Sequence, residues 1–175
     1  MSELKRFLRE WVGILVIAVV LSLVVRTYIA EARWIPSESM LPTLKIGDHL
    51  IIDKAYFKLS GLHRGDIVVF KAPPSAQKEE DLIKRVIGLP GEKIAVKDGV
   101  VYINDQELSE SYIAEKPNTD FAAITIPEDK VFVMGDNRNN SYDSRFWGTL
   151  PIENIIGKAV FLYYPFKDVG VLLSE

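Results

Sequence analysis

The chain has 175 residues, 48% of them hydrophobic, and a formal net charge of -3, which suits a membrane segment with one compact domain and leaves no room for a second large domain. The acidic balance argues against nucleic acid as a partner, because neutralising phosphates requires a basic face. The absence of cysteine excludes a thiol nucleophile, disulfides and thiolate metal sites.

An apolar segment near the N-terminus predicts a transmembrane helix. Residues 11–25 carry no charge and are apolar on every face, unlike an amphipathic surface helix. Continued to Ala30, the segment spans about 30 Å, the hydrocarbon thickness of a bilayer. Three basic residues precede the segment, Lys5, Arg6 and Arg9. This cluster favours a cytoplasmic N-terminus. We therefore expect a single-pass protein of the cytoplasmic membrane, with a cytoplasmic N-terminus (1–10), an anchor (11–30) and an extracytoplasmic domain (31–175).

A cleavable secretory signal is the alternative interpretation of this segment. A basic start, an apolar core and the small-x-small motif Ala30-Glu31-Ala32 all fit one. Against it, Arg26 interrupts the approach to the cut, and no linker separates the segment from the motifs that follow. We favour a retained anchor that contacts the lipid bilayer.

The domain after the anchor is predicted to be mostly β, because short runs of branched and aromatic residues alternate with Gly, Pro and Asp turns. The clearest element is a hairpin over 93–103, in which Asp98-Gly99 suits the positive φ angles of a tight turn. Further strands are predicted at 49–55, 66–71, 82–87, 130–134 and 156–164. The polar stretches 73–81 and 109–120 are predicted to be exposed loops.

Serine and lysine are the candidates for covalent catalysis. A serine hydroxyl needs a nearby base to become a nucleophile, and the two histidines, His49 and His63, lie in polar or turn-like stretches without a triad-like context. Lys84 shares a predicted strand face with Leu82 and Val86. Burial there would lower its pKa, as a lysine base requires.

Each of these segments also has a plain structural interpretation. Lys84 and Arg85 can be charges on a sheet edge that discourage aggregation, and the serines of segment 36–44 can be turn formers between prolines. The polar segment 135–148 can be a solvated loop whose Asp and Asn side chains bond local amides. Its density of polar side chains instead favours a set of contacts that fixes active-site geometry.

Four segments in order resemble the motifs of bacterial type I signal peptidases in their compact, single-anchor form. They read Pro-Ser-Glu-Ser-Met-Leu-Pro-Thr-Leu at 36–44, Gly-Asp at 47–48, Lys-Arg-Val-Ile-Gly-Leu-Pro-Gly-Glu at 84–92 and Gly-Asp-Asn-Arg-Asn-Asn-Ser-Tyr-Asp-Ser-Arg at 135–145. The resemblance implies a membrane-bound serine endopeptidase, without metal or cofactor, that removes signal peptides from exported preproteins after small-x-small (Ala-x-Ala) sites. Glu38 and Leu41 fill positions that other branches fill differently.

The resemblance also implies roles for single residues. Ser39 matches the nucleophile, Lys84 the general base, and Ser37 a hydroxyl that completes an oxyanion hole with the Ser39 backbone N–H. Ser141 matches a serine that orients the lysine amine. The matched supporting residues are the Asp143 and Arg145 ion pair, Asp136 and Arg138 nearby, and Gly135, which allows close backbone packing.

Substrate selection is expected from shallow apolar pockets beside the dyad, with the substrate lying extended along the Lys84 strand. The candidate lining residues, which can equally be core, are Ile35, Pro36, Met40, Leu44, Leu82 and Ile83. Four aromatic residues can either seat the domain at the membrane interface or belong to the core, and they are Trp34, Tyr56, Phe57 and Trp147. A non-catalytic, membrane-tethered β module that binds partners is the alternative to an enzyme.

Overall fold

The computed structural model describes residues 2–172, and the side chains of this range except those of residues 2–6 and 8–10. The basic cluster Lys5, Arg6 and Arg9 therefore lies outside the described side chains. The last three residues of the predicted domain also lie outside the described range.

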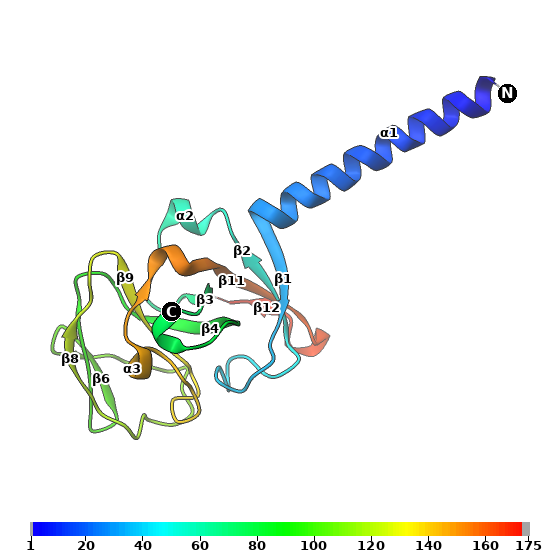
Figure 1. The fold of residues 1–175 in the computed structure, drawn as a ribbon. Coiled ribbons are helices and arrows are strands. Elements are labelled where there is room, and N and C mark those ends of the chain that lie inside the picture. Colours follow the sequence, from blue (N-terminus) through cyan, green and yellow to red (C-terminus); the bar gives the residue numbers. More distant parts are fainter. Residues whose placement is uncertain (1, 173–175) are drawn as a thin grey trace.

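A single long helix projects from the β domain (Figure 1). It consists of α1 (Ser2–Val24) and a π-helical turn, η1 (Val25–Ile29). The segment Trp11–Ile29 has a mean hydropathy of 2.5, and none of it is buried within the protein. A 19-residue segment of this hydropathy, with no part of it buried within the protein, fits a helix that lies in lipid.

Strand β1 (Ala30–Trp34) begins directly after η1, with no loop between them. It pairs antiparallel with β2 (His49–Asp53), so that Ala30 lies opposite Asp53 and Trp34 opposite His49. Strand β1 was not predicted from the sequence. Its pairing places the small-x-small motif at 30–32 inside a sheet instead of in a free segment.

An eight-stranded antiparallel sheet forms the larger part of the described domain. Its path runs β1-β2-β11-β3-β4-β9-β10, and β12 pairs with β11. The strands not yet given are β3 (Ile67–Lys71), β4 (Asp81–Gly88), β9 (Lys130–Met134), β10 (Leu150–Pro151), β11 (Ile155–Tyr164) and β12 (Gly170–Val171). Short helical turns connect them: α2 (Phe57–Ser60), η2 (Pro74–Ala76), α3 (Ser144–Trp147), η3 (Ile152–Asn154) and η4 (Phe166–Asp168).

A smaller four-stranded sheet, in the order β7-β6-β5-β8, lies on the side of the domain away from the anchor (Figure 1). Its strands are β5 (Lys93–Lys97), β6 (Val100–Ile103), β7 (Gln106–Glu107) and β8 (Phe121–Thr125). Ile94 and Val101 from this sheet pack with Phe132 and Met134 of β9 in one buried cluster. The small sheet is therefore joined to the strand that leads into the polar segment 135–148.

The mostly β architecture behind one apolar helix is confirmed, as are all the predicted strands to within two residues at each end. The hairpin turns at Asp98 and Gly99, which have φ angles of 51° and 75°. Strand β8 and the two-residue strands β7, β10 and β12 were not predicted. The stretch 109–120 contains no strand, but its description as an exposed loop is wrong at Tyr112, which is partly buried against two arginines. The stretch 73–81 likewise holds a buried residue, Ala76, in η2, and its last residue begins β4.

Candidate active site

Ser39 lies in a tight turn that apolar side chains fix to the core. Ile35, Met40 and Leu44 are 2%, 0% and 0% exposed and belong to one core cluster. Within the turn, the Leu41 N–H donates to the Glu38 carbonyl at 3.1 Å. Ser39 itself is 9% exposed. Met40 and Leu44, predicted as pocket lining, thus lie in the core and hold the turn.

Lys84 pairs with β3 on one side, and it is buried although the pairing of β4 with β9 on the other side begins only at Arg85. Lys84 and Arg85 are each 3% exposed, so their interpretation as charges on an exposed sheet edge is wrong. The Lys84 Nζ donates to the Ser39 Oγ at 2.7 Å and to the Ile83 carbonyl at 2.8 Å. Two segments 45 residues apart in sequence therefore meet at hydrogen-bond distance.

Burial lowers the pKa of Lys84 from its ordinary 10.5 to about 8. Desolvation of the ammonium is the main cause, and the negative charges of Asp143 and Asp136 partly oppose it. An unperturbed lysine is neutral in about one molecule in 2,500 at pH 7, whereas a pKa near 8 leaves roughly one in ten neutral. The site therefore holds an amine that accepts a proton near neutral pH.

The other two serines predicted for the site, Ser37 and Ser141, differ in their exposure and in their contacts. The Oγ of Ser37, an exposed residue, lies 3.4 Å from the Ser39 Oγ. The Ser141 Oγ is buried and has no hydrogen-bond partner among the described residues. A Cβ at Gly135 would overlap both Ser141 Oγ and the Ser39 carbonyl. Gly135 thus brings the end of β9 against the backbone of Ser39, a closeness that no other residue type permits.

Asp143 organises the segment after β9. Its carboxylate accepts from the Gly135 N–H at 3.0 Å, pairs with the Arg145 guanidinium at 2.8 Å and caps α3 by accepting from the Arg145 N–H. Arg145 Nη2 also donates to the Arg138 carbonyl at 2.6 Å. Because Asp143 and Arg145 are both buried at their charged ends, the pair links the two ends of this segment firmly.

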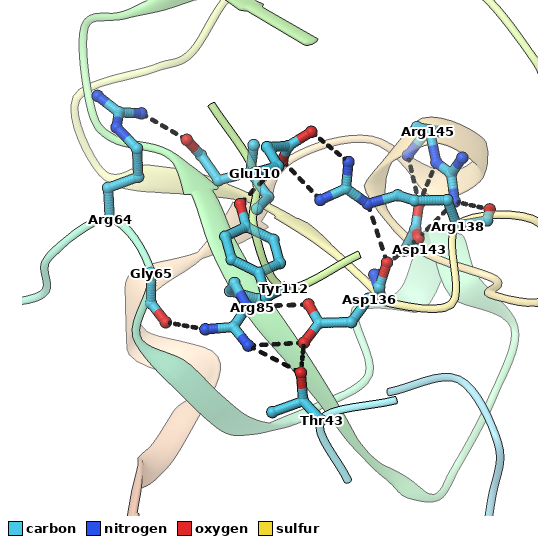
Figure 2. A network of polar contacts seen from close by, with 12 residues as sticks. Thr43, Arg64, Gly65, Arg85, Glu110, Tyr112, Asp136, Arg138, Asp143 and Arg145 are labelled. Atoms are coloured by element: carbon cyan, nitrogen blue, oxygen red, sulfur yellow. Dashed lines mark hydrogen bonds and ion pairs between the residues drawn. The ribbon is translucent and has the colours of Figure 1, made fainter. Parts of the chain in front are cut away.

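Asp136 pairs with Arg85, not with its neighbour Arg138. The Arg85 guanidinium donates to the two Asp136 oxygens at 2.8 and 2.6 Å, and the Thr43 hydroxyl donates to the same carboxylate at 2.6 Å (Figure 2). Thr43 lies in the serine turn, and Arg85 follows Lys84. One carboxylate therefore ties the serine turn, the lysine strand and the polar segment together.

Arg138 is held by a residue that the sequence analysis missed. Its guanidinium makes two hydrogen bonds of 2.7 and 2.6 Å to Glu110. The Tyr112 ring lies against Arg85, 4.1 Å from the guanidinium carbon, and its hydroxyl donates to Glu110 at 2.8 Å (Figure 2). Burial and the Glu110 charge raise the pKa of Tyr112. The loop that connects β7 to β8 in the small sheet is thus part of the site, and a Glu and a Tyr in a polar stretch were the only sequence signal.

Comparison with known proteins identifies the family. The family model described as signal peptidase, peptidase S26, matches residues 8–164. The chain belongs to this family. It is 48% identical to signal peptidase I of Leptolyngbya laminosa, covering 94% of this chain and 84% of that one, and 46% identical to the probable signal peptidase I-2 of Synechocystis sp., covering 92% and 75%. The crystal structure of a signal peptidase I from Enterococcus faecalis matches with a TM-score of 0.50 and 35% identity, over 56% of this chain and 96% of that one.

The activity is accordingly that of a signal peptidase I, a serine peptidase that cleaves signal peptides from exported preproteins. The single N-terminal helix is the membrane anchor typical of these enzymes. Within the described residues, no group of three or more His, Asp or Glu side chains is arranged to hold a metal ion.

A groove in this signal peptidase begins next to Ser37 and Lys84. It has a volume of about 200 Å³, and four of the predicted pocket residues line it, namely Ile35, Pro36, Leu82 and Ile83. The other lining residues are Arg33, Trp34, Val69 and Asp81. Of the four aromatic residues considered for the membrane interface, Trp34 and Tyr56 are exposed, whereas Phe57 and Trp147 are buried in the core.

Strand β4 offers a free edge along this groove. Its pairing with β3 runs from Arg85 to Asp81, but its pairing with β9 on the other side covers only Arg85 to Gly88. Residues 81–84 therefore have no strand partner on the second side among the described residues. A peptide that lies there gains main-chain hydrogen bonds next to Lys84.

Proposed function

We propose that Ser39 and Lys84 form the catalytic dyad of this signal peptidase, and that it cuts after small-x-small sites. The observation that carries the proposal is the 2.7 Å contact between Lys84 Nζ and Ser39 Oγ in a buried setting. That setting lowers the lysine pKa to about 8, so the amine serves as a base at neutral pH.

The first step is attack of the Ser39 Oγ on the scissile carbonyl carbon. When Lys84 is neutral, the Ser39 hydroxyl donates to the Nζ lone pair, and the proton moves to Nζ as the new C–O bond forms. The Ile83 carbonyl, 2.8 Å from Nζ, accepts one of the amine hydrogens and orients the lone pair. Ser141 Oγ, buried and without a hydrogen-bond partner among the described residues, supplies an acceptor for the ammonium that results.

The negative charge on the carbonyl oxygen then requires donors. The Ser37 hydroxyl and the Ser39 backbone N–H supply two from the same turn, and the 3.4 Å separation of the two serine Oγ atoms supports this assignment. Since apolar anchors and Gly135 hold the turn, these donors are in place before the charge develops.

Collapse of the intermediate breaks the C–N bond, and the Lys84 ammonium protonates the leaving amine of the mature protein. The signal peptide remains on Ser39 as an ester. Lys84, neutral again, takes a proton from a water that attacks the ester, and then returns it to Ser39 as the signal peptide leaves with a free carboxylate.

The substrate is proposed to add as a strand to the free edge of β4 at residues 81–84. Ile35, Leu82 and Ile83 line a groove of about 200 Å³, which favours small side chains near the cut. The anchor is proposed to cross the cytoplasmic membrane with its basic end in the cytoplasm, which puts Ser39 on the outer side.

The test is cleavage of a preprotein with an Ala-x-Ala site by the detergent-solubilised full chain, beside the Ser39→Ala and Lys84→Ala variants. We expect the wild type alone to cut, after the second alanine, with the new N-terminus identified by mass spectrometry. Equal cleavage by all three proteins would assign the chemistry to other residues. Ser60→Ala, an exposed serine in α2, is the matched control and should cut normally.

A further inference from the structure

Arg33 and Asp81 form an ion pair across the groove. Arg33 comes from β1 and Asp81 is the first residue of β4, and Arg33 Nη1 lies 3.0 Å from Asp81 Oδ2. Strands β1 and β4 are separated in the sheet by β2, β11 and β3. They face each other only because the sheet curls, as the right-handed twist of strands favours. The pair therefore links the two walls of the groove.

Arg33 is held in place by a second carboxylate. Its Nε lies 2.8 Å from Glu31 Oε1, and Glu31 Oε2 lies 3.1 Å from Lys54 Nζ. Lys54 in turn donates to the Arg26 carbonyl at the end of the anchor. A series of alternating charges therefore runs from the anchor to the groove. Because Glu31 binds the Nε side of the guanidinium, Nη1 still points across the groove when Asp81 is changed.

The position of the pair along the groove follows from strand geometry. Asp81 is three residues before Lys84, a distance of about 10 Å along β4 at the usual rise per residue. A peptide that runs parallel to β4, with its scissile carbonyl at Ser39, therefore brings its fourth residue before the cut close to Asp81. The two charged side chains are only 34% and 29% exposed, so a substrate side chain there meets them with little water between.

We propose, on the basis of the proposed function above, that Arg33 and Asp81 determine charge selectivity at the fourth substrate residue before the scissile bond. In the wild type the two charges satisfy each other, so an uncharged residue is preferred and neither sign is favoured. Removing one partner exposes the charge of the other to the substrate. The two single variants must therefore change selectivity in opposite directions.

The experiment uses the detergent-solubilised full chain and three Ala-x-Ala peptides with Glu, Gln or Lys at the fourth position before the cut. The readout is the ratio of kcat/KM for the Glu peptide to that for the Lys peptide, taken within each variant so that loss of folded protein cancels. Asp81→Asn should raise this ratio by about fivefold and Arg33→Gln should lower it by about fivefold, as expected for one partly exposed charge pair. Both shifts should shrink at high salt.

The matched control is the pair of Lys93 and Asp105, which lie 2.7 Å apart near the small sheet. Lys93→Gln and Asp105→Asn remove the same charges and should leave the ratio unchanged. The inference would be overturned if the ratio shifted in the same direction in both groove variants, or in neither. The proposed dyad would still stand in that case, provided that the wild type cuts the Gln peptide and Ser39→Ala does not. If wild type fails to cut the Gln peptide, the proposed function fails and this inference with it.

Discussion

The Arg138 guanidinium is fully buried, and its partner is Glu110, which lies 28 residues earlier in the chain on the loop between β7 and β8 of the small sheet. The two side chains share two hydrogen bonds of 2.7 and 2.6 Å, and Arg138 Nε also donates to the Gly135 carbonyl at 3.1 Å. Gly135 packs against the carbonyl of Ser39. The buried ion pair therefore connects the small sheet to the turn that holds Ser39.

Replacing Glu110 with Gln should strongly destabilise the domain. The change leaves the Arg138 charge buried without its counter-charge, which typically costs about 3–5 kcal/mol. Denaturant unfolding in detergent measures the loss, and Glu107→Gln, an exposed glutamate in β7, is the control. Equal stability of the two variants would contradict the importance of the buried pair.

Activity should rise with pH up to about pH 8 and level off above it. Lys84 acts in its neutral form, and its pKa is about 8, so kcat/KM should increase about tenfold per pH unit well below that value. The pH profile of a peptide without titrating groups checks this. A rise that continues unchanged to pH 10 would mean that the lysine keeps its ordinary pKa.

Lys84→Met should be more stable than the wild type at pH 7. The folded state disfavours the ammonium, and the difference between pKa values of 10.5 and about 8 corresponds to at most about 3 kcal/mol. The unfolded chain binds more protons between pH 8 and 10.5, so the wild type gains stability as pH rises through that window. The stability advantage of Lys84→Met over the wild type should be full below pH 8 and should vanish near pH 10.5. A constant difference across that range would contradict the lowered pKa.

Gly135→Ala should abolish most of the activity. A Cβ there overlaps the Ser39 carbonyl and Ser141 Oγ, so either the serine turn or the polar segment must move, and overpacking of this kind costs about 1–3 kcal/mol. Turnover of an Ala-x-Ala peptide measures the loss of activity, and the unfolding midpoint measures the loss of stability. The control is Gly13→Ala in α1, where a Cβ meets nothing within 4 Å.

Ser37→Ala should slow the enzyme without eliminating activity. Losing one oxyanion donor typically lowers kcat by about 10²–10³, roughly 3 kcal/mol. Since Ser37 is exposed and fixes no core contact, KM and stability should change little. A variant with wild-type kcat would remove Ser37 from the oxyanion hole.

Local patterns were sufficient to predict most strands and the anchor, whereas the meeting of Ser39 with Lys84 was implied by the ordered set of family motifs. The hairpin at Asp98 and Gly99 is an example, because its turn residues and the alternating polar and apolar residues of its strands lie within about ten residues of one another. β1 was missed because Ala30-Glu31-Ala32-Arg33-Trp34 has little intrinsic strand preference. Its structure comes from pairing with β2, a tertiary contact that no local pattern records.

The ion-pair partners were the least predictable part of the site. Asp136 and Arg138 are neighbours in sequence, yet each binds a residue far away, Arg85 and Glu110 respectively. The charges of segment 135–148 indicate that its side chains need partners of opposite charge. Which residues become those partners is decided by tertiary packing, including that of the small sheet. Met40 and Leu44 show the same limit, since an apolar residue next to a nucleophile suits core and pocket equally.

The direct passage from η1 into β1 leaves the catalytic domain without a hinge at the bilayer. The Lys54 N–H donates to the Ile29 carbonyl at 2.9 Å, so the last helical turn is also bonded to the residue after β2. The height of Ser39 above the lipid is therefore set by a paired strand instead of by a flexible tether. With Ser39 as the proposed nucleophile, a preprotein anchored in the same bilayer must span that fixed height, so the structure of the enzyme sets how far from the membrane the cut is made.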